Sequence, residues 1–395
     1  MRLNHGLHLA YCTNIHRGRN WAETLQSLET HTLAVRDRVS PGRPYAIGLR
    51  LSAQAARDLS DPPTLLEFQR WLDRENCYVF TINGFPYGQF HGTRVKEQVY
   101  APDWTSPERL AFTNLLFDLL AELTPGGIGG SVSTVPCSFK EFIREPAQEK
   151  AMRDHLWRCV EHVAALSERT GRDLHLGLEP EPLCYLETSA ETIRFFDQMH
   201  AEHPGDARLH RHLGVNYDTC HLAVEFEEAR DALQALERHG IRISKAHLSS
   251  ALKLRPTREA RHTLESFADD IYFHQVIERT PGGDLVRYRD LDVALAETRD
   301  RDLEGREWRI HFHVPLQSDP GHTFANTSDH IEGLLDWLQE RPERCHHLEM
   351  ETYTWEVLPE GLKNRSVEDQ LVSEYEWTLA RLRARHLAPG QGRTA

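Results

Sequence analysis

Short apolar runs alternate with longer amphipathic stretches along most of this chain, and this alternation restricts its fold more than any other feature. Strands that alternate with helices are typical of βα units, which build a parallel sheet. Eight such strands are the number that closes a (β/α)8 (TIM) barrel of the α/β class. The expected strands are Leu7–Thr13, Tyr45–Leu51, Tyr78–Asn83, Gly130–Val135, Leu174–Glu179, Leu213–Tyr217, Ile243–Leu248 and His346–Thr352.

The stretches between these strands carry helix signals. Trp21, Leu25 and Leu28 keep helical spacing, which predicts a helix with one apolar face. The segment Thr188–Glu191 has the pattern of a capping box, and Ser106-Pro107 that of a cap followed by a first-turn proline. Each expected strand therefore has a helix available to cover it.

We expect residues 1–388 to form one barrel domain, since 395 residues fit a barrel with insertions. A long charged region at about 254–314 interrupts the alternation and contains the strand-like run Arg309–Val314. We interpret it as an insertion after the seventh strand, because loops of this length usually have a function. The tail 389–395 is expected to be flexible.

The net charge of −14 argues against nucleic acid as a partner, because an acidic surface repels phosphate backbones. The first residues lack the apolar run of a signal peptide, and no stretch reaches the roughly 18 apolar residues of a membrane helix. We therefore expect a cytoplasmic protein without membrane insertion. The seven cysteines are an odd number without a CxxC pair, which predicts reduced thiols.

Polar side chains follow four consecutive expected strands, and in such barrels the strand ends hold the active site. The fifth strand ends at Glu179-Pro-Glu181, the sixth at Asp218-Thr-Cys-His221, the seventh at His247, and the eighth at Glu349-Met-Glu351. Carboxylates with imidazole and no thiolate suit an open site for Mn²⁺, Mg²⁺, Co²⁺ or Zn²⁺. Alternatively, each acid caps the next helix and each histidine is structural. We favour the metal interpretation because four strands share the pattern.

Strand alternation places Glu179 and Glu181 on one face, so only their depth separates them. We favour Glu179, because it directly follows the apolar run, and we favour Glu351 over Glu349. Lys245 shares a face with His247; it either approaches the pocket or forms a buried salt bridge.

The chain resembles the xylose-isomerase-like barrels, which include sugar isomerases, ketose epimerases and endonuclease IV-type phosphodiesterases. The resemblance covers about residues 170–355 and is carried by Leu178-Glu179, Asp218-Thr-Cys-His221, the run His247–Lys253 and Met350-Glu351-Thr352. It implies that Glu179, Asp218, His247 and Glu351 bind a divalent metal. It further implies that Glu179 and Glu351 exchange a proton beside a substrate carbonyl. Related barrels pair as dimers, which leaves a homo-oligomer open.

The resemblance also bears on the neighbouring histidines. We expect His221 to bind substrate or to join a second metal. The endonuclease-like relatives carry an Asp-x-His step where this chain has His311-Phe-His313, so one carboxylate is missing, although His313 still serves as a candidate for substrate binding. This departure argues against a three-zinc arrangement.

The segment Phe80–Tyr100 has the composition of a loop that wraps a polar ligand, or equally of a plain cluster of turns. We count Asn83, His91 and Lys96 as candidate substrate-binding residues.

A narrower resemblance is to the EboE family, barrel proteins of the ebo gene cluster described as metabolite-traffic proteins. It is carried by Asn83-Gly-Phe-Pro-Tyr-Gly88, the run Asp218–Phe226 and the run Glu351–Trp355. The leading hypothesis is a metal-dependent isomerase or epimerase acting on a small sugar- or polyol-type molecule. The alternatives are a non-catalytic barrel that holds a metabolite and a metal-dependent phosphoesterase.

Overall fold

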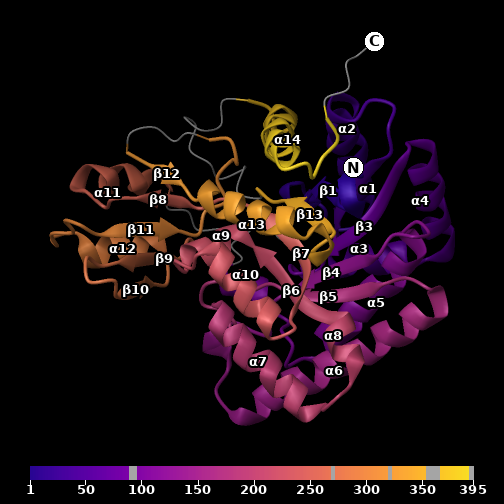
Figure 1. Cartoon of the computed structure of the whole chain (residues 1–395), viewed down its shortest axis with the longest axis horizontal. Helices are drawn as coiled ribbons and strands as arrows, with labels where there is room; N and C mark the ends of the chain where they lie inside the picture. Colours follow the sequence, from indigo (N-terminus) through magenta and orange to yellow (C-terminus); the bar gives the residue numbers. More distant parts are fainter. Residues whose placement is uncertain (89–95, 268–271, 319–322, 353–364, 391–395) are drawn as a thin grey trace.

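The computed structural model describes residues 1–88, 96–267, 272–318, 323–352 and 365–390. Its main sheet contains eight parallel strands in the order β1-β13-β7-β6-β5-β4-β3-β2. A parallel bridge from Cys12 to Gly48 joins β1 to β2 and brings the two edges together. The sheet is therefore the predicted (β/α)8 barrel, with helices around its outside (Figure 1).

The barrel strands are short and lie where the apolar runs predict them. Their bounds are β1 His8–Tyr11, β2 Tyr45–Arg50, β3 Cys77–Asn83, β4 Gly130–Thr134, β5 Leu174–Leu178, β6 Leu213–Asp218, β7 Arg242–Leu248 and β13 His347–Met350.

The helices that accompany them begin at the predicted caps, since Ser106 and Thr188 accept backbone hydrogen bonds at the starts of α5 and α7. The helices are α1 Trp21–Ser27, α2 Leu33–Val39, α3 Ala53–Leu59, α4 Pro62–Arg74, α5 Pro107–Leu123, α6 Pro146–Thr170, α7 Ser189–Glu202, α8 Ala207–His212, α9 Thr219–Val224, α10 Ala229–Arg238, α13 Ser328–Glu340 and α14 Val367–Ala384. Within the described ranges, no helix is long and apolar enough to cross a membrane.

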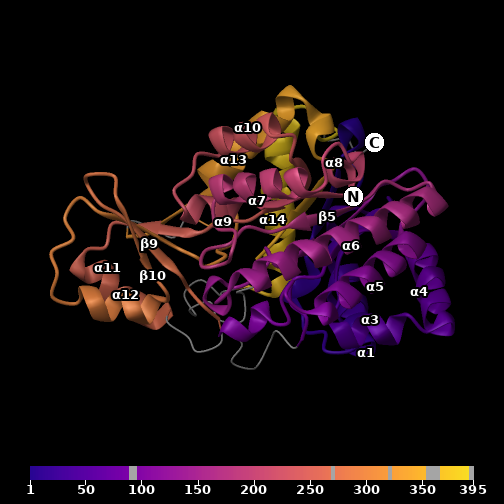
Figure 2. The ribbon, with the colours of Figure 1, turned by 90° about the horizontal axis from the view of Figure 1, so that it is seen from below.

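A second, antiparallel sheet lies between β7 and α13 in the sequence. Its order is β10-β9-β11-β8-β12, and Figures 1 and 2 show it beside the barrel. It begins at Leu252 and ends at Asn326, so it extends beyond the range 254–314 expected from the sequence. Its elements are β8 Leu252–Leu254, α11 Arg258–Leu264, β9 Val276–Arg279, β10 Leu285–Tyr288, α12 Leu291–Thr298, β11 Glu307–Ile310 and β12 Ala325–Asn326.

The expected strand Arg309–Val314 is only partly regular, because β11 ends at Ile310. Beyond it, the His311 amide donates to Gln275 and the Val314 amide donates to Ser250. The backbone thus leaves the second sheet and returns to the barrel, which carries His311 and His313 towards the strand ends.

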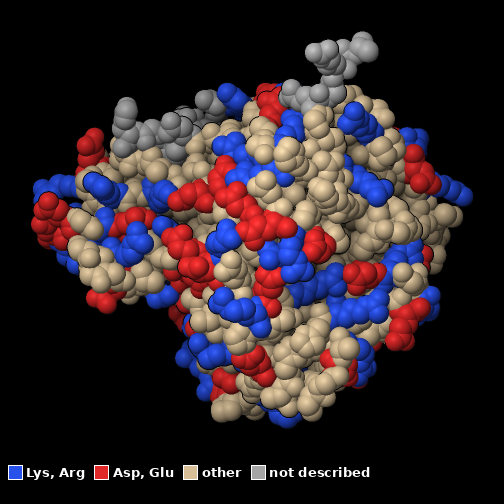
Figure 3. Space-filling model, in the orientation of Figure 1, with Lys and Arg blue, Asp and Glu red and all other residues tan. Residues whose placement is uncertain are grey.

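Acidic and basic side chains are interspersed on the face shown in Figure 3. Several form ion pairs between neighbouring helices, such as Arg385 of the last helix turn with Asp336 of α13 at 2.6 Å. Exposed pairs of this kind contribute little to stability.

The free cysteines are all buried, in agreement with the prediction of reduced thiols.

A buried ion pair joins the segment after β3 to the second sheet. Lys96 Nζ lies 2.6 Å from Asp290 Oδ2, and both side chains are less than one tenth exposed. Asp290 also caps α12, because its Oδ1 accepts from the backbone amide of Leu291. The pair therefore couples two segments that are far apart in sequence.

Replacing Lys96 by Met should lower the free energy of unfolding by about 3 kcal/mol, because it leaves the buried Asp290 carboxylate unpaired. The double variant Lys96→Met/Asp290→Asn should recover part of this loss, since asparagine keeps the cap without the charge. Urea unfolding of the wild type, both single variants and the double variant measures the coupling. Strictly additive effects would show that the pair contributes nothing.

Glu374 of α14 is buried, and its Oε1 accepts from Thr352 at 2.8 Å and from Gln370 at 3.0 Å. Burial raises the pKa of Glu374 to about 7, because these hydrogen bonds only partly offset it. A raised pKa means that the folded state holds the proton more tightly than the unfolded chain does. The resulting contribution to the free energy of unfolding is complete below the unfolded-state pKa near 4.5, and it is lost as the pH rises through 7.

The variant Glu374→Gln should therefore lose less stability than the wild type between pH 5 and pH 8. The difference should be on the order of 3 kcal/mol, from a pKa change of a little over two units. Chemical unfolding at several pH values measures it, and parallel pH curves for the two proteins would contradict the assignment.

Candidate functional site

The strand register brings the polar residues of three strands together at the C-terminal end of the barrel. Asp218 of β6 pairs with His247 of β7, and His247 in turn pairs with Glu349 of β13. Glu351 directly follows β13, two residues after Glu349 and on the same face. Glu179 directly follows β5, where its amide donates to Thr134.

His247 is the centre of this group. Its Nδ1 lies 2.9 Å from Glu179 Oε1, 3.1 Å from Glu351 Oε2 and 3.5 Å from Asp218 Oδ2. One ligand atom from each of these four residues can be chosen so that all lie within 4.8 Å of one another. All four side chains are at most 4% exposed. The structure thus brings together the four residues that the sequence predicted as metal ligands.

The ionisation of this group follows from its charges. Burial would lower the pKa of His247, but Glu351 and Glu179 outweigh burial and hold it well above the ordinary value. Burial would raise the pKa of Glu179, and the charge of His247 lowers it instead. Burial also opposes ionisation of Asp218, yet the neighbouring histidines keep its pKa well below the usual range. The carboxylates of Glu179 and Asp218 are therefore ionised and attract positive charge.

Two carboxylate oxygens of the group, Glu179 Oε2 and Asp218 Oδ2, are buried without a hydrogen-bond partner among the described residues. Buried oxygens of ionised acids are costly unless something positive binds them. The other oxygen of Asp218 accepts from the amides of Cys220 and His221 and from the Ser249 hydroxyl. Asp218 is thus oriented through one oxygen and presents the other to the group.

Behind His247, Glu349 and Lys245 form a buried ion pair inside the barrel. Glu349 Oε2 lies 2.9 Å from His247 Nε2 and 2.7 Å from Lys245 Nζ. Burial would raise the pKa of Glu349, but Lys245 and His247 lower it to about 2. Of the two roles considered for Lys245, the structure has the buried salt bridge. Glu349 orients His247 from behind, as carboxylates do for metal-binding histidines.

Gly48 of β2 makes room for this pair. A Cβ at this position would lie 1.9 Å from Glu349 Oε1 and 2.6 Å from the Tyr11 carbonyl oxygen. Any side chain at Gly48 would displace Glu349, so the glycine is required for the carboxylate to fit inside the barrel.

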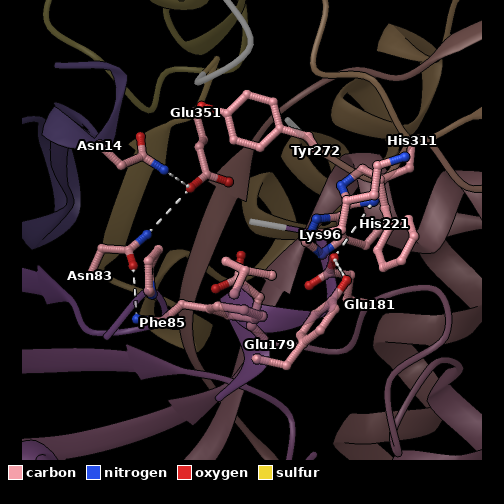
Figure 4. Close-up of a pocket in the computed structure, with 14 residues that line it drawn as sticks. Asn14, Asn83, Phe85, Lys96, Glu179, Glu181, His221, Tyr272, His311 and Glu351 are labelled. Atoms are coloured by element: carbon pink, nitrogen blue, oxygen red, sulfur yellow. Dashed lines mark hydrogen bonds and ion pairs between the residues drawn. The ribbon is translucent and has the colours of Figure 1, made fainter. Parts of the chain in front are cut away.

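A pocket with an empty volume of about 540 Å³ opens above Glu179 and Glu351. Asn14 and Asn83 lie beside Glu351, with their Nδ2 atoms 2.7 Å and 3.3 Å from Glu351 Oε1 (Figure 4). The remaining lining residues are Phe85, Pro86, Lys96, Val99, Tyr100, Glu181, His221, Tyr272, Phe273 and His311.

The candidate substrate-binding residues have different positions. Asn83, Lys96 and His221 line the pocket. The Lys96 ammonium is held by Asp290, and His91 lies outside the described residues. His313 does not line the pocket; its Nδ1 lies 3.1 Å from the Glu351 carbonyl oxygen.

A second group of possible ligands shares Asp218 with the first. It contains Asp218, His221 and His313, whose ligand atoms lie within 4.8 Å of one another. His221 Nδ1 lies 3.0 Å from the Pro180 carbonyl oxygen, and its Nε2 lies 3.9 Å from Asp218 Oδ2. Since Nδ1 of each histidine faces a carbonyl oxygen, Nε2 is the atom that each could offer as a ligand, and Nε2 of His313 also lies 3.3 Å from Nε2 of His311.

Sequence reasoning missed two parts of the site. Asn14 follows β1, so the strand-end rule could have found it. Tyr272 and Phe273 precede a strand of the second sheet and have no sequence signal that connects them with the barrel. Glu181, which was ranked behind Glu179, lines the pocket and accepts from the Tyr100 hydroxyl at 2.8 Å. Burial raises the pKa of Glu181 to about 7.

No family model matches the chain, and no curated protein matches it either. The resemblance to the EboE family therefore stays a prediction from the sequence.

Solved structures do match. A xylose isomerase-like TIM barrel protein from Mycobacterium smegmatis in complex with magnesium has a TM-score of 0.53 and 13% identity, covering 98% of this chain and 100% of its own. D-psicose 3-epimerase with D-tagatose from Clostridium cellulolyticum has a TM-score of 0.52 and 13% identity, with coverages of 96% and 99%. A D-tagatose 3-epimerase-like protein has a TM-score of 0.51 and 10% identity, covering 95% of this chain and 97% of its own. The chain therefore shares its barrel fold with these structures.

Proposed function

We propose that this protein is a divalent-metal-dependent isomerase or epimerase that acts on a small hydroxy carbonyl compound of the sugar or polyol type. The observation that carries the proposal is the group of Glu179, Asp218, His247 and Glu351, two of whose members, Glu179 and Glu351, line a pocket. Structural likeness to sugar epimerases supports the reaction class only by analogy, because one fold hosts many functions.

The residues fit a divalent ion. Three carboxyl groups and one imidazole are hard or borderline ligands, which Mn²⁺, Mg²⁺, Co²⁺ and Zn²⁺ accept. The unpartnered oxygens of Glu179 and Asp218 are available to it. Since Glu349 faces His247 Nε2, Nδ1 would be the ligand atom and would lose its proton when the ion binds.

A bound divalent ion would polarise the substrate carbonyl and stabilise the negative charge that develops when the neighbouring carbon loses a proton. Glu179 and Glu351 come from β5 and β13, and both reach the pocket (Figure 4). A carboxylate on each side of the carbon allows one to remove the proton and the other to return it. Asn14 and Asn83 hold Glu351 in place for this role.

We further propose that Asp218, His221 and His313 can hold a second ion, with Asp218 between the two positions. Two metals would also suit phosphoester hydrolysis, so a generic phosphodiester assay separates that alternative from isomerisation.

Wild-type protein should retain Mn²⁺, Co²⁺ or Zn²⁺, whereas the double variant Asp218→Asn/His247→Ala should lose the ion, because two of four ligands are removed. Elemental analysis measures the metal content. A matched control is Asp197→Asn/His239→Ala, which removes an exposed Asp–His pair at 3.1 Å. Saturating metal, at about 100 times Kd, should stabilise the wild type and the control by about 2.7 kcal/mol, and not the site variant.

In D2O, the metal-loaded wild type should exchange the proton beside the carbonyl of a ketose into solvent, as followed by NMR. Wild-type protein that binds no divalent ion would refute the proposal. Bound metal without exchange across a broad panel of hydroxy ketones would favour a barrel that holds a metabolite, as the EboE resemblance implies.

The second ion has its own test. The double variant His221→Ala/His313→Ala should bind one divalent ion fewer than the wild type and keep the one held by His247. Metal titration by calorimetry gives the stoichiometry. A wild type that binds a single ion even at saturation would contradict the second position, and the first would be unaffected.

A further inference from the structure

The pocket lining is divided in chemical character. Its floor is formed by Glu179 and Glu351, while much of the remaining lining is apolar or aromatic: Phe85, Pro86, Val99, Tyr100, Tyr272 and Phe273. These six residues come from the loop after β3, the segment that precedes α5, and the second sheet's connection before β9. Residues from outside the barrel strands therefore provide most of the apolar surface that a substrate would meet.

Three of these aromatic rings are linked through ring contacts. Phe85 meets Tyr100 edge to face, with ring centroids 6.0 Å apart and an interplanar angle of 64°, and Tyr100 stacks on Phe139 at 4.9 Å with an interplanar angle of 9°. Phe139 in turn stacks on Phe273 at 6.0 Å and 13°. Each ring is supported by the next, so this aromatic wall has a fixed shape before any ligand binds.

The wall is also held from the side of the second sheet. Lys96 Nζ lies 5.5 Å from the Phe273 ring centroid and is bound to Asp290. The Tyr100 hydroxyl donates to Glu181, which fixes the Tyr100 ring in place. The lysine thus supports the wall through its ion pair, and it also lines the pocket.

Several polar groups near the floor are already bonded within the protein. The amides of Asn14 and Asn83 donate to Glu351, and the Asn83 carbonyl accepts from the Phe85 amide. A substrate with hydroxyl groups along its whole length would place some of them against the rings. Burying a hydroxyl without a partner is unfavourable, whereas burying an apolar group there is favourable.

Building on the proposed function, we propose that the substrate is amphipathic. Its hydroxy carbonyl end lies at Glu179 and Glu351, and an aryl or branched alkyl group at its other end packs against Phe85, Tyr100 and Phe273. The reaction remains a proton exchange at the carbon beside the carbonyl, and the apolar group takes no part in it.

The test compares two ligands with the same reacting end in Mn²⁺-loaded protein: hydroxyacetone and 1-hydroxy-3-phenylpropan-2-one. Calorimetry should give a Kd at least about tenfold lower for the phenyl ligand. Phe273→Ala should remove this preference by raising the Kd of the phenyl ligand towards that of hydroxyacetone. Phe273→Leu, which keeps an apolar side chain, should retain part of the preference and covers the case in which the alanine variant does not fold.

The matched control is Phe267→Leu, in the same inserted region. Phe267 packs against Phe312 and Phe324 and does not line the pocket, so this variant should keep the wild-type preference.

Equal affinity of the wild type for both ligands would overturn the inference, as would Phe273→Ala and Phe273→Leu variants that keep the preference in full. Wild type that takes up Mn²⁺ and binds neither ligand would overturn it too. A metal titration of the same samples separates this failure from that of the proposed function. If the protein takes up no Mn²⁺, the proposed function is refuted, and the proposed substrate class with it. If the protein binds Mn²⁺ and exchanges the hydroxyacetone proton but shows no preference between the two ligands, only the amphipathic substrate is refuted.

Discussion

The concentration of buried negative charge at the C-terminal end of the barrel is the constraint on which the rest of the site depends. Four carboxylates, those of Glu179, Asp218, Glu349 and Glu351, lie within one group whose nitrogen bases are Lys245 and His247. Removing ions from water is so unfavourable that such a group is stable only if charges compensate one another closely. The charge of Lys245 compensates that of Glu349, so three acids remain around His247. A further positive charge would stabilise this group.

The barrel interior beneath this group is also polar, but it is not charged. His175 and His347 lie with ring centroids 5.2 Å apart, and their side chains are bonded to Ser244 and Ser131. Burial holds the pKa of both histidines well below the ordinary value, so they are neutral. Many barrels fill this space with aliphatic side chains. Here hydrogen-bonded side chains of different strands fill the space instead, and they add no charge to that of the site above.

Much of the fold could be predicted because periodicity and strand ends are local properties of the sequence. The eight strands follow from apolar runs, and the meeting of Asp218 with His247 follows from parallel strands ending at one edge. The preference for Glu351 over Glu349 agrees with their positions, since only Glu351 faces the pocket. The sequence could not connect Lys96 with Asp290, or Phe273 with Phe139, because these contacts join segments that only the folded chain brings together.

The second sheet makes the pocket a composite of two separately encoded parts. The ends of the barrel strands provide Glu179 and Glu351 at its floor, while the inserted region contributes Tyr272 and Phe273 to its wall. Under the proposed function, substitutions or length changes in the insertion would alter which molecule fits without disturbing Glu179 and Glu351. Such an arrangement would let selection change substrate preference in small steps while the acids stay constant. It would also mark the insertion as the stretch to redesign for a new ligand.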